Sequence, residues 1–280
     1  YEDRPKAGLW IWERKYELDS LCHVFLLALR YGEVTGRTAF MDDVFFSAAE
    51  KMMEIIETEQ QHEQKSAYRF QRFDCPPSDT LKREGLGTPV AYTGMSWSGF
   101  RPSDDACEYG YFIPANLFAA VMLERFAPVA EKLGHAELGV RARRLAAEIR
   151  RGIEKFGLVK TEKFGEIYAY ETDGMGHYRL MDDANIPSLL SLPYLGICRA
   201  DDPLYQRTRA FVLSRQNPYY FEGSAAKGVG SPHTPENFVW PIALCVQGLT
   251  AAEPKERAEL LHTLLTTHAD TARMHESFNK

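Results

Sequence analysis

The sequence predicts an all-α fold in which pairs of antiparallel helices close into a toroid. Three observations lead to this prediction. Long segments carry apolar residues at helical spacing, these segments come in pairs separated by short breaks, and strand patterns are few. The chain has 280 residues, of which 45 % are hydrophobic, so it can bury one sizeable core. We therefore expect residues 1–280 to form a single domain.

Eight helices in four pairs are expected from the apolar periodicity. In the first helix, for example, Leu18, Cys22 and Phe25 fall on one face. Clear breaks occur near Gly134 and Pro254. The predicted helices span 18–29 and 41–55, 116–133 and 138–156, 183–195 and 204–213, and 237–250 and 255–270. One β-hairpin is expected, joining 166–170 to 177–180.

Charge and cysteine content exclude several classes of function. The net charge is 33 − 39 = −6, and no run of Lys or Arg is present, so we expect no nucleic-acid partner. We find no signal peptide or apolar run of membrane-spanning length, so we expect no membrane contact. The five cysteines lack a C-x-x-C pair, which argues against a zinc or redox motif and favours a cytoplasmic location. Nothing in the sequence indicates an oligomeric state.

Five clusters that combine acids or amides with aromatic residues interrupt the apolar pattern. They occupy 12–20, 97–105, 181–187, 235–241 and 274–278. The first four lie at or before the start of a predicted helix, where Ser, Asp and Asn are common caps and acids suit the helix dipole. Capping alone explains 182–185, but a cap needs no neighbouring Trp or Arg. If alternate helices form an inner ring, the clusters converge on one pocket.

Such a pocket suits the hydrolysis of a glycosidic bond. One carboxylic acid protonates the leaving oxygen, and a second carboxylate activates water or attacks the sugar, without a metal ion. Other catalytic motifs are missing: the sequence has no H-E-x-x-H or Walker loop, and residues 94–99 do not match G-x-S-x-G. The pair Asp182 and Asp183 offers an alternative, a divalent-ion site in a metal-dependent lyase or cyclase.

The clusters resemble signatures of glycoside hydrolase family 125. The matching segments, in family order, are K-Y-E-L-D-S-L-C from Lys15, W-S-G-F-R-P-S-D-D-A-C from Trp97, M-D-D-A-N-I-P-S from Met181, E-N-F-V-W-P from Glu236 and M-H-E-S-F from Met274. The resemblance covers nearly the whole chain. It implies an (α/α)6 barrel and an exo-acting α-1,6-mannosidase that removes terminal mannose from a glycan. It also implies inversion at the anomeric carbon, with no metal or other cofactor.

The resemblance also implies roles for individual residues. The general acid is an Asp of R-P-S-D-D, which corresponds to Asp104 or Asp105, and we choose Asp104. The general base is the Glu of H-E-S-F, which corresponds to Glu276. From their positions in or near the clusters, we expect these residues to bind substrate: Trp12, Tyr16, Asp19, Trp97, Arg101, Asp183, Asn185, His233, Asn237, Trp240 and His275.

The sequence departs from the family pattern at both ends. No G-D-I-P-A-M-W-L-R-D-S-like segment is present, and the chain stops four residues after Glu276. We therefore expect 1–280 to be one catalytic domain of the (α/α)6 type that lacks N- and C-terminal portions, with an incomplete barrel. A non-catalytic fragment that binds mannose or a glycan is the alternative function.

Overall fold

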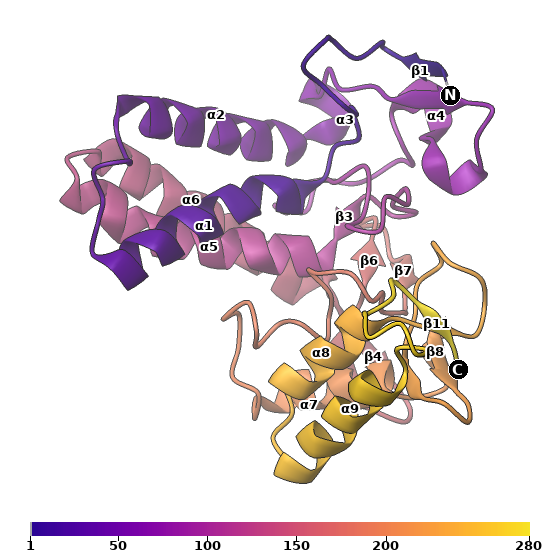
Figure 1. Ribbon diagram of the computed structural model, residues 1–280. Helices are drawn as coiled ribbons and strands as arrows, with labels where there is room; N and C mark the ends of the chain where they lie inside the picture. The colour runs from indigo at the N-terminus through magenta and orange to yellow at the C-terminus, as the bar shows by residue number, and fades with distance from the viewer. Residues whose placement is uncertain (1) are drawn as a thin grey trace. The chain divides into compact units, whose positions relative to one another are not determined.

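The computed structural model describes residues 2–280 and is mostly helical, with short strands between the helices (Figure 1). The chain divides into two compact units. Unit 1 contains the described residues up to Arg101, together with Ala106–Gly157 and Glu171–His177. Unit 2 contains Pro102–Asp105, Leu158–Tyr170 and Tyr178–Lys280. The single domain expected from the sequence stays a prediction.

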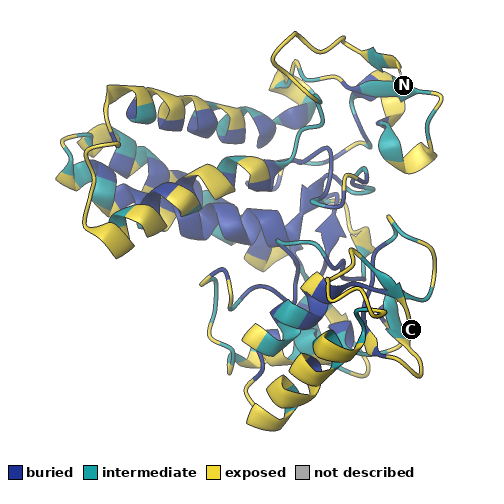
Figure 2. Ribbon diagram, viewed as in Figure 1, coloured by how far each residue is buried: buried dark blue, intermediate teal, exposed yellow. Residues whose placement is uncertain are grey.

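Four long helices form the core of unit 1, where the apolar periodicity predicts them. They are α1 (Leu18–Thr35), α2 (Asp43–Glu59), α5 (Ile113–Lys132) and α6 (Ala136–Phe156). Helix α5 packs against α1 and α6 and is buried along most of its length, whereas its neighbours each expose one face (Figure 2). Hydrophobic burial of α5 therefore organises this unit.

Helix α5 also qualifies the expectation that the chain has no apolar run of membrane-spanning length. Among the described residues, α5 alone is long and apolar enough to cross a membrane by length and composition. However, 78 % of its apolar window is buried inside the protein, as in the core helix of a globular fold.

Short elements complete unit 1. Strands β1 (Glu2–Arg4) and β2 (Gln71–Phe73) pair antiparallel, as do β3 (Tyr111–Phe112) and β6 (Glu171–Thr172). The loop between α2 and α5 also contains α3 (His62–Lys65), the 3-10 helix η1 (Pro77–Asp79) and α4 (Lys82–Gly85).

Unit 2 combines three helices with short antiparallel strands. Helices α8 (Pro241–Leu249) and α9 (Pro254–Thr266) pack together as the predicted fourth pair, and α7 (Pro203–Val212) packs near β5. The strands are β4 (Leu158–Thr161), β5 (Gly165–Tyr168), β7 (Tyr178–Arg179), β8 (Tyr220–Glu222), β9 (Lys227–Val229), β10 (Phe238–Val239) and β11 (Phe278–Asn279). Strand β4 pairs with β5, β8 with β9, and β10 with β11.

The predicted hairpin was right in part. The Tyr170 amide donates to the Arg179 carbonyl at 2.9 Å, so the two expected strands meet at that pair. Strand β5 overlaps the expected first strand but pairs with β4, which was not predicted from the sequence. A tight turn at 162–164 brings β4 and β5 together.

The predicted helix at 183–195 was also wrong, because side chains take the place of helical backbone hydrogen bonds there. The two side-chain oxygens of Asp182 accept the amides of Leu189 and Leu190 at 2.8 and 2.9 Å. The Ser188 amide donates to Ser191 Oγ and the Ser191 amide to Ser188 Oγ. Such local bonds compete with helix formation, so the segment folds as a series of turns.

Close packing around α6 leads to a stability prediction. A Cβ at Gly152 would lie 2.7 Å from the Thr93 carbonyl oxygen, whereas the nearest atom to one at Gly248 of α8 is 3.7 Å away. Gly152→Ala should therefore lower the free energy of unfolding by roughly 1–3 kcal/mol, since the clash outweighs the gain in helix propensity. Gly248→Ala should raise it by roughly 0.5–1 kcal/mol. Urea denaturation of both variants measures the difference, and equal effects would contradict this packing.

Asp19, in the first turn of α1, is a second unusual feature of unit 1. The residue is 4 % exposed, and its Oδ1 atom has no hydrogen-bond partner among the described residues. Burial, with a smaller contribution from the charge of Glu17, raises the pKa of Asp19 to about 8. The side chain is therefore neutral at pH 7 in the folded protein.

The raised pKa of Asp19 predicts how stability depends on pH. Between pH 4 and 8 the folded protein keeps this proton while the unfolded chain has lost it, so the free energy of unfolding falls as pH rises. Asp19→Asn should reduce that slope between pH 5 and 7 by about 1.4 kcal/mol per pH unit. Chemical denaturation at several pH values measures the slope.

Asp201→Asn is the control for this prediction. Asp201 is exposed, and its hydrogen bond with Arg199 lowers its pKa, so it stays ionised throughout this pH range. Its substitution should leave the slope unchanged. Parallel curves for Asp19→Asn and the unsubstituted protein would show that Asp19 is ionised.

Candidate active site

Three of the polar clusters are joined by backbone hydrogen bonds within unit 2. The Ala184 amide donates to the Gly230 carbonyl at 3.1 Å, and the Trp240 amide donates to the Val229 carbonyl at 3.2 Å. In the β10–β11 pair, Val239 lies opposite Phe278. The clusters at 181–187 and 235–241 are therefore linked through the 229–230 segment, and the cluster at 274–278 is linked to the second of them through the β10–β11 pair. Convergence of the clusters on one pocket stays a prediction.

The segment 102–105, here called the acid loop, also belongs to unit 2. Its two aspartates differ sharply. Asp105 is 5 % exposed and accepts a hydrogen bond from Ser103 Oγ at 3.2 Å, whereas Asp104 is exposed. Asp104 also has a left-handed backbone, with φ of 66°, a conformation that Asp tolerates better than most residues. An exposed carboxyl can reach a ligand in solution, which favours Asp104 over Asp105 as the acid.

Glu276 lies two residues before β11 and is exposed. The neighbouring His275 is exposed as well, and its Nε2 atom lies 3.2 Å from the His268 carbonyl and 3.4 Å from Thr271 Oγ1. Both candidate catalytic acids, Asp104 and Glu276, thus lie in unit 2 as exposed residues. A general acid and a general base must each come within hydrogen-bond reach of a bound substrate or water, which an exposed side chain can do.

The Asp182-Asp183 pair has a structural explanation. Burial raises the pKa of Asp182 to about 8, and both of its oxygens accept backbone amides. Asp183 is also buried, and its Oδ1 atom accepts hydrogen bonds from the amide and the side chain of Asn185, both at 3.3 Å. Across residues 2–280, no three His, Cys, Asp or Glu side chains form a group that could hold a metal ion.

The remaining predicted residues of unit 2 lie on or beside the 231–240 segment. His233 is exposed, Asn237 is half-buried with a left-handed backbone (φ of 71°), and Trp240 is 6 % exposed. The Trp240 indole donates to Thr234 Oγ1 at 2.9 Å, which fixes the ring. The Asn237 carbonyl accepts the Lys280 amide at 2.9 Å and so extends the β10–β11 pair.

Unit 1 holds the other predicted binding residues, and there the first two clusters are joined. The Tyr16 carbonyl accepts the amides of Gly99 and Phe100 at 3.1 and 3.0 Å, and the Leu18 amide donates to Ser98 Oγ at 3.0 Å. These five residues tie the start of α1 to the segment that leads into the acid loop.

The five predicted binding residues of unit 1 differ widely in exposure. Trp12 is 98 % exposed, Arg101 is 3 % exposed, and Asp19 is buried as described above. Tyr16 is half-buried, and its ring lies nearly parallel to that of Trp97 at 6.2 Å. Their contacts with substrate stay predictions.

Trp97 is enclosed rather than presented to a ligand. It is 1 % exposed, and its ring stacks on His62 with centroids 3.7 Å apart. Glycines make room for the indole, since a Cβ at Gly110 would lie 2.1 Å from Trp97 Nε1 and one at Gly87 would lie 2.8 Å from Cζ2. Trp97 therefore packs as an interior side chain, in contrast to the sugar-binding ring expected from the sequence.

Two buried acids that contact residues of these clusters were not predicted from the sequence. Glu59 accepts Ser66 Oγ at 2.6 Å and lies 2.5 Å from Nδ1 of His62, the residue on which Trp97 stacks. Glu171 is fully buried and bonds to Arg101 at 2.6 Å. Neither acid lies in a polar-aromatic cluster, so the sequence carried no local signal for them.

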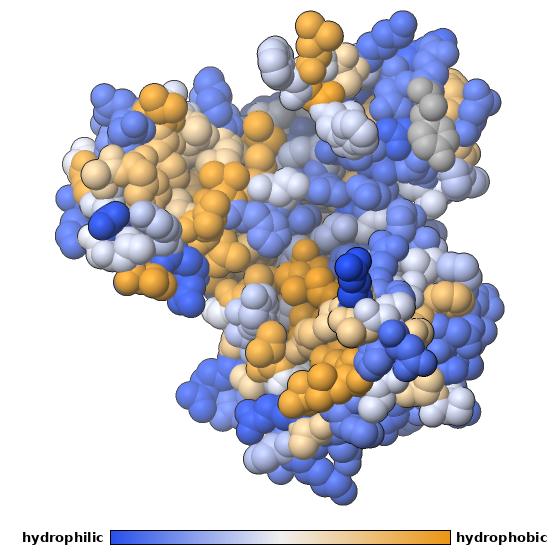
Figure 3. Space-filling model, viewed as in Figure 1, coloured by the Kyte–Doolittle hydropathy of each residue, from blue (hydrophilic) through white to orange (hydrophobic). Residues whose placement is uncertain are grey.

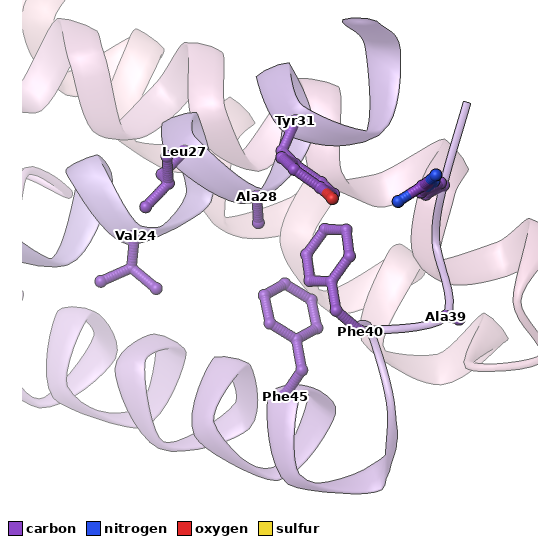
Figure 4. Close-up of a pocket in the computed structure, with 8 residues that line it drawn as sticks. Val24, Leu27, Ala28, Tyr31, Ala39, Phe40 and Phe45 are labelled. Carbon is purple, nitrogen blue, oxygen red and sulfur yellow. The ribbon is translucent and has the colours of Figure 1, made fainter. Parts of the chain in front are cut away.

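An apolar groove in unit 1 contrasts with these polar segments (Figure 4). It lies between α1, α2 and the loop that joins them, with a volume of about 570 Å³. Exposed apolar side chains gather on this part of the surface (Figure 3). The lining residues are Val24, Leu27, Ala28, Tyr31, Arg37, Ala39, Phe40 and Phe45. None of these eight is a carboxylic acid, so the groove does not provide two-carboxylate chemistry.

Two curated or solved proteins share extensive similarity with the chain. The Meiotically up-regulated gene 157 protein of Schizosaccharomyces pombe is 40 % identical over 277 residues, which are 95 % of this chain and 54 % of that protein. A Streptococcus pneumoniae structure, described as a metal-independent α-mannosidase in a non-productive complex with α-1,6-mannobiose, is 44 % identical with a TM-score of 0.96. The match covers 99 % of this chain and 66 % of that one.

A more distant likeness supports the fold alone. A bacterial glucoamylase bound to acarbose matches with a TM-score of 0.58 at 13 % identity, over 95 % of this chain and 37 % of that one. The chain thus spans 54 % of the length of the Schizosaccharomyces pombe protein and 66 % of that of the Streptococcus pneumoniae protein. The model of one family, described as metal-independent α-mannosidase (GH125), matches residues 2–280. The chain therefore belongs to glycoside hydrolase family 125, the family that its sequence motifs indicated.

Proposed function

We propose that the protein is an exo-acting glycoside hydrolase that removes terminal α-1,6-linked mannose from a glycan. The observation that carries this proposal is the match, at a TM-score of 0.96 over 99 % of the chain, to an α-mannosidase in complex with α-1,6-mannobiose. The exposed carboxyl groups of unit 2 fit that chemistry, because hydrolysis of a glycosidic bond needs two of them. The proposed reaction uses no metal ion, in line with the description of the family.

In the proposed mechanism, Asp104 protonates the oxygen that links the two mannose units as the glycosidic bond breaks. Glu276 takes a proton from a water molecule, which attacks the anomeric carbon from the opposite face and inverts it. Inversion requires room for that water, so we expect the two carboxyl groups to lie roughly 6.5–9.5 Å apart when substrate is bound. The burial of Asp105 and its bond with Ser103 support a structural role for that residue.

The proposed binding site draws on the loops around these acids. Asn185, His233, Asn237 and His275 offer amide and imidazole groups in unit 2, and none of the four is fully buried. Amides and imidazoles can grip sugar hydroxyls in the neutral state. We assign them to the binding of mannose.

We also propose an (α/α)6 barrel to which residues 1–280 contribute as part of one catalytic domain. The packing of α5 with α6 and of α8 with α9 supports this, because such a barrel is assembled from helical pairs. We propose a cytoplasmic location, supported by the five cysteines, all of which are free thiols.

Hydrolysis of α-1,6-mannobiose is the direct test of the proposed activity. Because inversion converts the α-linkage, β-mannose should be the first product, and NMR that resolves the two anomers should detect it before mutarotation. Release of α-mannose first would refute inversion. Binding of mannobiose by calorimetry without any hydrolysis would support the glycan-binding alternative instead.

Substitution of the three acids tests their roles. Asp104→Asn and Glu276→Gln should each lower kcat by about 10²–10⁴-fold, since each removes a proton-transfer group. Asp105→Asn is the matched comparison and should lower kcat less than Asp104→Asn, because Asp105 bonds to Ser103 instead of reaching solvent. Steady-state kinetics on mannobiose measure all three. The reverse order for the two aspartates would identify Asp105 as the acid.

A further inference from the structure

We propose that Glu171 is a positioning residue for the general acid, because it fixes both ends of the acid loop. This inference rests on the proposed function and on the choice of Asp104 as the acid. Glu171 lies far from the loop in sequence, 70 positions after Arg101, and it belongs to none of the polar clusters.

The contacts of Glu171 reach residues on both sides of the loop. Its Oε1 atom accepts a hydrogen bond from Arg101 Nε at 2.6 Å, immediately before the loop. Its Oε2 atom accepts the backbone amides of Glu108 and Tyr109 at 2.8 and 2.9 Å, just after the loop. Glu171 is 0 % exposed and Arg101 is 3 % exposed, so water does not weaken these bonds.

Backbone bonds hold the same two ends together. Phe100 forms an antiparallel bridge with Ala106, and the Cys107 amide donates to the Gly99 carbonyl at 2.9 Å. Glu171 is itself fixed in β6, where it lies opposite Phe112 of β3. Only the four residues 102–105 lie between the fixed ends, so the chain there has little freedom to move independently of them.

The hydrogen-bond pattern leaves no place for a donor on the Glu171 side chain. All three partners are donors, two peptide N–H groups and a guanidinium, so a proton on either carboxyl oxygen would face a donor. A glutamine has the same shape but one NH₂ group. If that group faces Arg101 it meets a cation, and if it faces Glu108 and Tyr109 it meets two N–H groups. Either orientation releases one end of the loop.

Release of one end should displace Asp104 while Glu276 stays in place, since the segment that follows Glu276 is held by the separate β10–β11 pair. The defect should therefore fall on protonation of the leaving group. With mannobiose, the leaving sugar oxygen needs the proton from Asp104. With α-mannosyl fluoride, the fluoride ion leaves with little need for a proton, so the base and water alone can complete the reaction.

The test compares Glu171→Gln with Asp173→Asn in the same protein. Asp173 is a matched control, because it is also buried, at 2 % exposed, and also accepts two backbone amides. Its Oδ1 atom accepts the amides of Met175 and His177, and its Oδ2 atom lies 2.6 Å from His177 Nδ1. These contacts hold the 173–177 turn and do not involve the acid loop. Each variant is assayed on α-1,6-mannobiose and on α-mannosyl fluoride, and amide hydrogen exchange is measured at Glu108 and Tyr109.

Glu171→Gln should lower kcat on mannobiose by about 100-fold, the usual cost of misplacing a catalytic group by about 1 Å, with little change in KM. On α-mannosyl fluoride the loss should stay below about threefold, and exchange at Glu108 and Tyr109 should accelerate. Asp173→Asn should change none of these readouts by more than about threefold.

Three outcomes would overturn the inference. Equal losses of kcat on both substrates would show that Glu171 only maintains the fold, and unchanged exchange at Glu108 and Tyr109 would show that it does not hold the loop. A Glu171→Gln variant as active as the unsubstituted protein on mannobiose would remove the positioning role while leaving the proposed function intact. An unsubstituted protein that hydrolyses neither substrate would instead refute the proposed function, and with it the link from Glu171 to catalysis.

Discussion

Buried acidic side chains whose oxygens accept backbone amides hold the irregular segments of this protein in place. A buried N–H group without a partner is costly, and loops lack the regular partners that helices and strands provide. Asp182 meets this need for two amides of the 189–190 turn, Glu171 for two amides after the acid loop, and Asp173 for two amides of the 173–177 turn. The acid loop of the candidate site is flanked by the partners of one of these acids, Glu171, so its geometry depends on a buried acid.

The same constraint separates acids that shape the protein from acids that can do chemistry. Asp182 and Glu171 are buried, and all of their oxygens accept hydrogen bonds from groups of the protein. Asp104 and Glu276 are exposed on loops. A catalytic acid must exchange protons with a ligand, which requires access, whereas a structural acid works best without it. Adjacent residues such as Asp104 and Asp105 can therefore have different roles, and exposure distinguishes them better than sequence does.

Apolar periodicity predicted most of the helices because these helices bury one face. Helices α1, α2 and α6 follow this rule, α5 is buried along most of its length, and α8 and α9 pair as expected. The failure at 183–195 has a physical cause. Ile186, Leu189 and Leu190 follow a helical spacing, but the turns of this segment bury apolar side chains too, and its amides are satisfied by Asp182 and serine hydroxyls. Apolar residues at helical spacing indicate that one face of the segment is buried. They indicate a helix only when no side chain competes for the backbone amides of that segment.

The residues of the candidate site could be predicted where several polar residues are adjacent in the sequence. They could not be predicted where a residue far away in the sequence holds the site in place. The clusters around Asp104 and Glu276 stood out because acids, amides and aromatics are adjacent in the chain. Trp97 stood out for the same reason, yet it packs in the interior on His62, since a tryptophan beside polar residues has the same sequence pattern in either role. Glu171 was missed because its partners lie 62 to 70 positions away.

The acid and the base are held by different kinds of interaction, and this difference has consequences for variation. The segment after Glu276 is held by the backbone pairing of β10 with β11, which continues in the bond from the Lys280 amide to the Asn237 carbonyl. Backbone hydrogen bonds between strands survive most side-chain substitutions. The position of the base should therefore change little when nearby side chains are substituted. The acid loop depends in addition on one side chain, that of Glu171. A side chain of another charge or length would leave at least one of its three hydrogen-bond donors unsatisfied. Sequence change at a distance should therefore disturb proton donation to the leaving group before it disturbs activation of water.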